Sequence, residues 1–231
     1  MKPITIAIDG YAGCGKSTTA KRVAQELGYV FIDTGAMYRA VTLFFLRNDI
    51  PFDQVNPQML EALDQIKVGF TLSPDYPFPL VTVNDEIVEG EIRNPEVSGN
   101  VSQVAVHKPV RQAMVAQQQE MGKAGGVVLD GRDIGTVVFP FAELKVFMRA
   151  DMEVRANRRL AELESKGVEI TLDEVIHNLQ ERDRIDTTRE ESPLKQAEDA
   201  RVLDTTLLGI DEQVQQVLEW VREVQTARSA Q

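Results

Sequence analysis

The sequence predicts an α/β fold in which a five-stranded parallel sheet is flanked by helices. Five short apolar segments recur along the chain, helical patterns lie between most of them, and several of the apolar segments end in aspartate. Strands that alternate with helices form parallel sheets with helices on both faces. The expected core strands are residues 4–9, 29–33, 127–130, 145–148 and 201–204.

The first expected strand leads into a glycine-rich loop with the spacing glycine, four residues, Gly-Lys-Ser. Apolar residues then recur on one helical face, so the loop joins a strand to a helix. This context predicts a phosphate-binding loop for a nucleoside triphosphate, and a glycine-rich turn that binds nothing is the alternative. The loop, called the P-loop below, consists of Gly10, Tyr11, Ala12, Gly13, Cys14, Gly15, Lys16, Ser17 and Thr18.

The chemistry of phosphate binding explains these residue types. Glycines let the backbone turn its N–H groups toward phosphate oxygens, and a helix start adds partial positive charge. Lys16 is placed to reach the β- and γ-phosphates, and the Ser17 hydroxyl is placed to bind Mg²⁺. Cys14 is either a redox-sensitive thiol, because thiol pKa values fall at helix starts, or a small residue that fills the loop. We favour the second interpretation.

The second expected strand is followed by Asp-Thr-Gly-Ala-Met-Tyr-Arg, residues 33–39. The Thr34 hydroxyl, the Tyr38 ring and the Arg39 guanidinium can together bind a second phosphate at the carboxyl end of the sheet, where ligands of such folds bind. A strand-to-helix turn, with Thr34 as the cap and Tyr38 in the core, is an equally good alternative.

An insertion interrupts the alternation of strands and helices. Residues 68–72, 80–83 and 86–88 form short alternating patterns separated by a proline-rich segment and by Asn84-Asp85. This pattern predicts a small antiparallel sheet within about 68–92. An unfolded excursion is the alternative.

Two charged clusters lie in the second half of the chain. Asp-Gly-Arg-Asp-Ile-Gly-Thr, residues 130–136, follows the third expected strand, and it forms either a ligand site or a tight turn with a local ion pair. Thr171 and Glu174 form a capping box that opens a helix. On that helix Arg182, Asp186 and Arg189 share a face, which is either functional or solvated.

Composition narrows the possible functions. The chain has 231 residues, one cysteine and a net charge of −11, which argues against nucleic-acid binding through a basic surface. No run of about 18 apolar residues could span a membrane, and a strand from residue 4 leaves no room for a secretory signal. We expect a cytoplasmic monomer with no membrane or nucleic-acid partner.

Taken together, these motifs resemble the bacterial cytidylate kinase family of nucleoside monophosphate kinases. The resemblance covers nearly the whole chain, and it includes the P-loop, Asp-Thr-Gly-Ala-Met-Tyr-Arg, Gly-Glu-Ile-Arg, Ser102-Gln103-Val104-Ala105, Val110-Arg111, Asp-Gly-Arg-Asp-Ile-Gly-Thr-Val-Val-Phe and Glu-Arg-Asp…Asp…Arg. It implies a P-loop kinase core at 1–38 and 110–231 with a helical lid at about 151–170. Residues 39–109 would form a monophosphate-binding region that holds the inserted sheet.

The resemblance also implies roles for individual residues. The P-loop would bind ATP, with Mg²⁺ on Ser17, and Lys16, Arg132, Arg155, Arg158 and Arg159 would be catalytic, the last three from the lid. The residues implied in CMP binding are Thr34, Tyr38, Arg39, Ser102, Arg111, Asp130, Arg132, Asp133, Arg182, Asp186 and Arg189. Among them, Ser102, Arg111 and Asp133 would contact the cytosine edge.

The implied reaction transfers a phosphoryl group from ATP to CMP or dCMP, which yields ADP with CDP or dCDP. A GTPase is a weaker alternative, because the chain lacks an Asn-Lys-x-Asp motif for guanine. A kinase of the same fold with another acceptor is a closer alternative, and a nucleotide-binding module without activity is a third.

Overall fold

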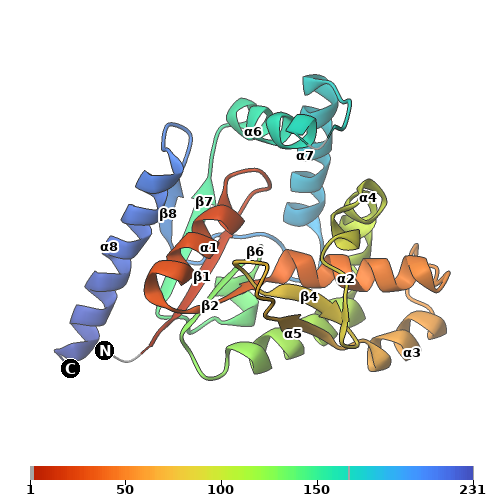
Figure 1. The fold of residues 1–231 in the computed structure, drawn as a ribbon, viewed down its shortest axis with the longest axis horizontal. Helices are drawn as coiled ribbons and strands as arrows, with labels where there is room; N and C mark the ends of the chain where they lie inside the picture. The colour runs from red at the N-terminus through yellow and green to blue at the C-terminus, as the bar shows by residue number, and fades with distance from the viewer. Residues whose placement is uncertain (1–2, 166, 231) are drawn as a thin grey trace. The chain divides into compact units, whose positions relative to one another are not determined.

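The computed structural model describes residues 3–165 and 167–230. The chain divides into two compact units, which are described separately below. The first, called the core unit, combines Met1–Ile32 with Gly125–Gln231, and the second, called the insert unit, is Asp33–Ala124. Figure 1 labels most of the helices and strands of the two units.

The core unit is built on a five-stranded parallel sheet with the strand order β2-β6-β1-β7-β8. This confirms the predicted sheet. β1 is the central strand, and its residue Asp9 lies beside Gly131 of β6 and Phe147 of β7. The strands are β1 (Thr5–Gly10), β2 (Val30–Asp33), β6 (Val127–Gly131), β7 (Leu144–Arg149) and β8 (Arg201–Asp204).

Apolar faces of two helices cover this sheet. α1 (Lys16–Leu27) and α8 (Ile210–Ser229) share one apolar core with the strands, and Val23, Val146 and Val217 are among its buried members. Figure 1 shows α1 and α8 running beside the sheet strands. This core extends to the carboxyl ends of the strands, because Met148 of β7 and Cys14 of the P-loop are among its buried members.

The region predicted as a lid contains α6 (Met152–Ser165) and leads into α7 (Leu172–Thr188). The two helices pack on each other through a small apolar cluster that includes Ala156, Val175 and Leu179, together with Ala12 of the P-loop. The predicted capping box is confirmed, since Thr171 caps α7 and Glu174 bonds back to the Thr171 N–H. The helical pair is therefore in apolar contact with the P-loop.

The insert unit contains the predicted antiparallel sheet, which is thereby confirmed. β4 (Leu80–Val83) pairs with β3 (Val68–Thr71) on one side and with β5 (Glu86–Ile87) on the other. Asn84 and Asp85 connect β4 to β5 with φ angles of 49° and 68°, as a tight hairpin turn requires. The helices of this unit are α2 (Thr34–Arg47), α3 (Pro57–Gln65), α4 (Pro95–Val104) and α5 (Lys108–Gly122), with the short turn η1 (Glu91–Arg93) before α4.

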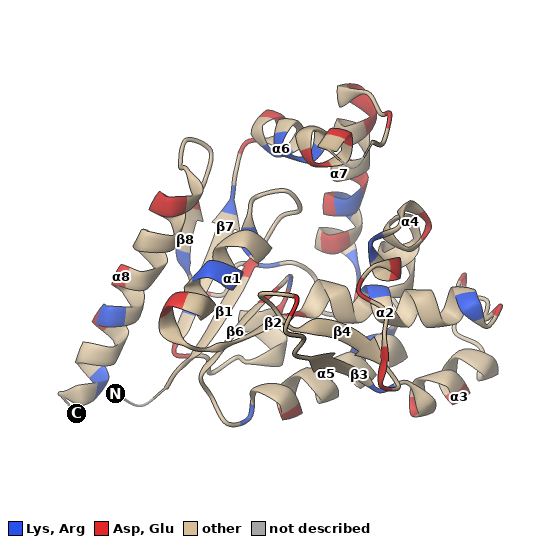
Figure 2. Cartoon of the chain, viewed as in Figure 1, with Lys and Arg blue, Asp and Glu red and all other residues tan. Residues whose placement is uncertain are grey.

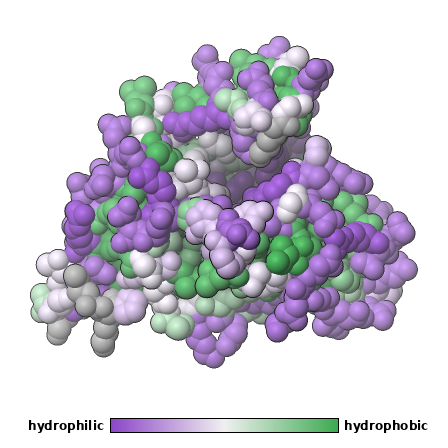
Figure 3. Space-filling model, viewed as in Figure 1, coloured by the Kyte–Doolittle hydropathy of each residue, from purple (hydrophilic) through white to green (hydrophobic). Residues whose placement is uncertain are grey.

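The face of the molecule drawn in Figure 3 is mostly polar. Hydrophilic residues cover most of the face seen in Figure 3, and apolar residues form only small areas between them. Within the described ranges, every helix is too short or too polar to cross a membrane.

Candidate active site

The P-loop joins β1 to α1 with three glycines at positive φ. These are Gly10, Gly13 and Gly15, with φ of 147°, 77° and 91°. A Cβ atom on Gly10 would lie 2.0 Å from the carbonyl oxygen of Met148 on β7, so no other residue fits there. The loop backbone thus needs the glycines that the motif supplies.

Donors from three parts of the core unit hold the carbonyl groups of the P-loop. Lys16 Nζ donates to Tyr11 O at 2.6 Å, Arg155 Nη1 donates to Ala12 O at 3.1 Å, and Thr205 Oγ1 donates to Cys14 O at 3.0 Å. The C=O and N–H of neighbouring peptides in such a loop point to opposite sides, so holding the carbonyls orients the N–H groups toward an anion.

Lys16 is buried at the first position of α1. Burial lowers the pKa of its ammonium group, and the Arg132 charge lowers it further, whereas Cys14, Asp130 and Asp186 raise it. An anionic ligand would favour the charged form again. The position therefore suits a phosphate better than it suits an isolated ammonium ion.

Cys14 is completely buried in the P-loop. Its Sγ lies 3.0 Å from Tyr11 O and 3.5 Å from Met148 O. This burial supports the interpretation of Cys14 as a small residue that fills the loop.

Ser17 and Asp130 meet at the carboxyl end of the sheet. The Ser17 hydroxyl donates to Asp130 Oδ2 at 2.6 Å, and Asp130 is buried near the end of β6. Oxygen donors of this kind suit Mg²⁺, and a P-loop hydroxyl with a strand-end aspartate is the usual pair for it. Within residues 3–165 and 167–230, no three His, Cys, Asp or Glu side chains form a metal site, so phosphate oxygens and water would have to complete the coordination.

The predicted cluster after β6 forms a turn with ion pairs to distant residues. Arg132 Nε donates to Asp186 Oδ2 of α7 at 2.7 Å, and Asp133 lies 3.8 Å from the guanidinium of Arg189. Arg132 therefore pairs across 54 positions of the chain, which a turn with only a local ion pair does not explain.

Asp186 is the charged centre of this cluster. Burial opposes its charged form, but the guanidinium groups of Arg132 and Arg189 outweigh burial and lower the pKa of Asp186 below its ordinary value. Arg182, one turn earlier on α7, adds a smaller effect in the same direction. Figure 2 shows basic and acidic residues alternating along α7. The predicted face of Arg182, Asp186 and Arg189 thus belongs to a buried ionic cluster. Glu181 and Arg184, in contrast, pair in solvent.

Arg189 differs from the prediction in its backbone. The helix α7 ends at Thr188, and Arg189 has an extended conformation with ψ of 142°. Its Nη2 donates to Ser192 O at 2.7 Å, and Ser192 precedes Pro193, a position where helical backbone is disfavoured. The side chain nevertheless returns to Asp186 at 3.5 Å.

The three arginines predicted in the lid have separate partners. Arg155 is buried and donates to Asp183 at 2.7 Å as well as to the P-loop, with its guanidinium 5.3 Å from the centre of the Tyr11 ring. Arg158 donates to the carbonyl and hydroxyl of Thr205. Arg159 pairs with Glu162 at 2.7 Å. In this conformation the first two arginines tie α6 to the loops beside it.

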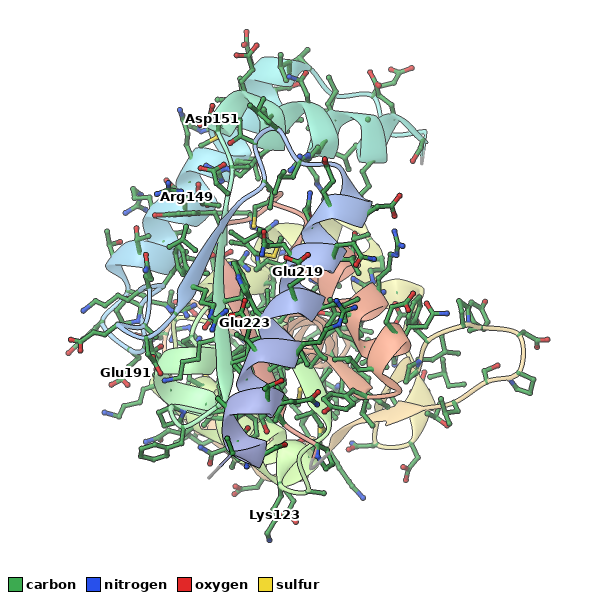
Figure 4. All side chains as sticks on the ribbon, turned by 90° about the vertical axis from the view of Figure 1, so that its left-hand side faces the viewer. Lys123, Arg149, Asp151, Glu191, Glu219 and Glu223 are labelled. Atoms are coloured by element: carbon green, nitrogen blue, oxygen red, sulfur yellow. The ribbon has the colours of Figure 1, made fainter. Side chains whose placement is uncertain are left out.

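The base of α6 is fixed to the last strand. Arg149, labelled in Figure 4 near the end of β7, pairs with Asp204 of β8 at 3.0 Å. Asp151, labelled just beyond it, donates its N–H to the Thr206 hydroxyl at 3.1 Å. The chain therefore enters α6 from a position that β7 and β8 define.

The insert unit holds a second group of predicted site residues around Asp33. The Asp33 carboxylate caps α2 by accepting from Ala36 N at 2.7 Å, and it pairs with Arg39 at 3.3 Å and with Arg93 at 3.2 Å. The predicted strand-to-helix turn is present and Tyr38 is buried, but the cap is Asp33 and Thr34 is the first residue of the helix, so that detail of the alternative is wrong. The residue missed here is Arg93, although the Gly-Glu-Ile-Arg motif contains it.

Tyr38 and Arg111 lie together in the same unit. The guanidinium of Arg111 is 5.3 Å from the centre of the Tyr38 ring, and both residues are buried. Arg111 also donates to Ala105 O at 3.2 Å, at the end of the helix that carries the half-buried Ser102.

Sequence reasoning also missed residues of the core unit that hold the site. Thr205 binds the P-loop and Asp183 binds Arg155. Neither contact gave a signal, because both join segments far apart in sequence. Asp9, one of the aspartates that end the predicted strands, binds the turn after β6.

Comparisons with known proteins identify the family of this chain. A family model described as cytidylate kinase matches residues 6–223. The cytidylate kinase of Phocaeicola vulgatus is 54% identical over 215 residues, covering 92% of this chain and 94% of that protein. The cytidylate kinase of Flavobacterium psychrophilum is 51% identical over 226 residues, covering 97% of this chain and 100% of that protein. Among solved structures, a gluconokinase from Sinorhizobium meliloti has a TM-score of 0.52 at 15% identity, with 99% of this chain and 98% of that chain covered, which shows a shared fold.

Proposed function

The chain belongs to the cytidylate kinase family, and on that premise we propose that it transfers the γ-phosphoryl group of ATP to CMP and dCMP. The products are ADP with CDP or dCDP. The observation that carries this proposal is the buried cluster at the carboxyl end of the sheet. There a P-loop with Lys16 and Ser17 is joined, through Asp130, to the turn that holds Arg132 and Asp133.

The nucleophile is a phosphate oxygen of the acceptor. The second pKa of a phosphate monoester is about 6, so this oxygen is largely ionised at neutral pH and needs no general base. Catalysis then consists of in-line positioning and of neutralising charge on the transferred group.

Positive charge for that purpose comes from the P-loop and the lid. Lys16 reaches the β- and γ-phosphates by exchanging its bond to Tyr11 O for phosphate oxygens, and Arg132 binds the acceptor phosphate. Arg155, Arg158 and Arg159 are assigned to the closed lid, which excludes water from the transferring group. Arg155 and Arg158 must exchange their present backbone partners to contact it.

Ser17 and Asp130 are the proposed protein ligands of Mg²⁺. The ion, when bound with ATP, neutralises charge on the phosphate oxygens. The 2.6 Å contact between the Ser17 hydroxyl and Asp130 brings both oxygen donors together.

Recognition of the cytosine base is assigned to Asp133 in the core unit. A buried carboxylate accepts a hydrogen bond from the 4-amino group of cytosine, which uracil lacks, and Asp133 is 4% exposed. The other groups of this unit assigned to CMP are Asp130, Arg132, Arg182, Asp186 and Arg189, with Arg182 and Asp186 on the ribose hydroxyls.

In the insert unit, Arg39 is assigned to the CMP phosphate. Its guanidinium is already oriented by the Asp33 carboxylate. Ser102 and Arg111 are assigned to the base, and Thr34 and Tyr38 complete the assigned set. We further propose a cytoplasmic monomer that binds nucleotides as small molecules, since the reaction needs only ATP and a nucleoside monophosphate.

A coupled ADP-release assay tests the function. ATP and Mg²⁺ are supplied with CMP, dCMP, UMP, AMP, GMP or shikimate, each in turn. Fast turnover on CMP and dCMP with slower turnover on UMP is expected. Turnover on another acceptor would keep the kinase fold and reject the cytosine assignments, and ATP binding without transfer would indicate a binding module.

A further inference from the structure

Asp9 is a buried carboxylate for which the proposed reaction has no direct use. It is 4% exposed and lies one residue before the end of β1. Its Oδ1 accepts from Ile134 N at 2.8 Å, and its Oδ2 accepts from Gly135 N at 2.7 Å. Both oxygens therefore bind the first turn of η2 (Ile134–Val138), the π-helical turn after β6.

The backbone of Asp9 is tied to the other end of the same segment. In the pairing of β1 with β6, Asp9 lies beside Gly131. Arg132 and Asp133 are the two residues between Gly131 and Ile134. Asp9 therefore contacts the chain on both sides of Arg132 and Asp133, the two residues assigned to the acceptor.

The turn has little room to shift away from Asp9. A Cβ atom on Gly135 would lie 3.3 Å from Asp9 Oδ2 and 3.1 Å from Lys145 Cδ. Lys145 is itself fixed on β7, because its Nζ donates to Pro140 O at 2.6 Å and to Asp199 at 2.9 Å. The turn is packed between the carboxylate of β1 and the lysine stem of β7.

A carboxylate suits this task better than an amide. Above its pKa, an aspartate is ionised, accepts two N–H bonds and has no donor, whereas an asparagine offers one oxygen and would turn an NH₂ group toward the second N–H. Keeping the charge buried has a free-energy cost. The two backbone hydrogen bonds lower the pKa of Asp9, but burial outweighs them and raises it to about 7. A buried charge that is costly in this way adds little to stability, which fits a role in positioning.

We propose that Asp9 is a positioning residue for acceptor recognition, and that it sets the orientation of Asp133 and Arg132 by holding Gly131 and the start of η2. The proposal rests on the proposed function, because it takes cytosine selectivity as the property that Asp9 controls. Asp9 acts through Asp133 and Arg132, without touching the acceptor itself.

Steady-state kinetics of the full-length chain test this role. The variants are Asp9→Asn, which keeps one acceptor oxygen, Asp9→Ala, which keeps none, and Val217→Ala as a control for stability lost in the apolar core shared by α1 and α8. We expect the CMP-over-UMP ratio of kcat/KM to fall about tenfold in Asp9→Ala and less in Asp9→Asn, as expected for a displaced functional group. KM for ATP stays near the wild-type value, and Val217→Ala keeps the wild-type ratio.

An unchanged ratio in folded Asp9 variants would overturn the proposal. Amide hydrogen exchange of the wild-type chain keeps it testable if the variants do not fold. Slow exchange at Ile134 and Gly135 is expected, and exchange as fast as that of exposed loop amides would show that the tether does not form. If the wild-type chain transfers nothing to CMP, the proposed function fails, and the exchange measurement still decides whether Asp9 holds the turn.

Discussion

Arg132 Nε donates to Asp186 Oδ2 across 2.7 Å, and this ion pair joins the turn after β6 to α7. Their side chains are 20% and 9% exposed, so water competes little for the contact. Arg189 approaches the other oxygen of the same carboxylate at 3.5 Å. Asp186 therefore orients two guanidinium groups before any ligand binds, which is the preorganisation that charge stabilisation in a transition state requires.

Replacing Arg132 by alanine should lower kcat far more than it weakens ATP binding. The side chain is assigned to the acceptor phosphate, and an arginine that stabilises a transferring phosphoryl group contributes on the order of 10³ in kcat. Turnover on CMP and the Kd of ATP by calorimetry measure the two effects. Arg184→Ala is the matched control on α7, because Arg184 pairs with Glu181 in solvent. Equal losses in turnover and ATP affinity would contradict the assignment.

Replacing Asp133 by asparagine should narrow the preference for CMP over UMP. An amide can turn its NH₂ group toward the base, which opposes the 4-amino group of cytosine and suits the uracil oxygen. Loss of one buried hydrogen bond costs about 1–3 kcal/mol, or roughly a tenfold to hundredfold change in the ratio of kcat/KM values. The ratio is measured at saturating ATP. A ratio equal to that of the wild type would remove Asp133 from base recognition.

The sheet and the hairpin were predictable because their signals are local. Short apolar runs mark β1, β6 and β7, and the Asn84-Asp85 turn marks the hairpin between β4 and β5. The P-loop was predictable for the same reason, since glycines, lysine and serine follow one another directly in the sequence. In each of these cases a few neighbouring residues determine the backbone.

The ion pairs could not be predicted from such signals. Arg132 meets Asp186 across 54 positions, and Arg93 meets Asp33 across 60. The periodicity of apolar residues indicates which face of a helix or strand a side chain occupies. It gives no information on the residue that this side chain pairs with in another helix or strand. The end of α7 was missed for a related reason, because the bond from Arg189 to Ser192 O competes with continuation of the helix.

Replacing Ser17 by alanine should raise the Mg²⁺ concentration needed for activity. The variant removes one of the two proposed protein ligands and leaves Asp130 without its 2.6 Å partner. Changes near a metal commonly cost about tenfold to a hundredfold in affinity or activity. Turnover is measured across a Mg²⁺ titration, and chelation with EDTA should abolish wild-type activity. Thr19→Val is the control, because that hydroxyl bonds Gln213 at 2.9 Å on the buried side of α1. The same Mg²⁺ dependence in both variants would argue against the site.

Asp9 should make stability fall as the pH rises. The pKa of Asp9 is raised from 3.8 to about 7, chiefly by burial. The Asp133 charge also raises this pKa, whereas the N–H groups of Gly135 and Ile134 and the Lys16 charge lower it. Between these pKa values the folded chain holds a proton that the unfolded chain has lost, so the free energy of unfolding decreases toward pH 7 and then levels off.

The variant Asp9→Asn cannot ionise, so it should lack this component of the pH dependence. Urea unfolding at intervals between about pH 5 and pH 8 measures the difference between the variant and the wild type. The free energy of unfolding of Asp9→Asn relative to that of the wild type should increase steadily up to about pH 7. Parallel curves for the two proteins would show that Asp9 titrates as an ordinary carboxyl.

Arg155 and Arg159 offer a matched comparison between a buried and an exposed ion pair on one helix. Arg155 pairs with Asp183 at 2.7 Å with both side chains at least 86% buried, whereas Arg159 pairs at the same distance with the half-exposed Glu162. Arg155→Met keeps the apolar stem and leaves the Asp183 charge buried, which should cost about 3–5 kcal/mol of unfolding free energy. Arg159→Met should cost less than about 1 kcal/mol, because exposed pairs are hydrated and screened. Urea unfolding measures both, and adding Asp183→Asn to Arg155→Met should recover part of the loss. If the two single variants lose the same stability, Arg155 does not anchor the lid to the P-loop.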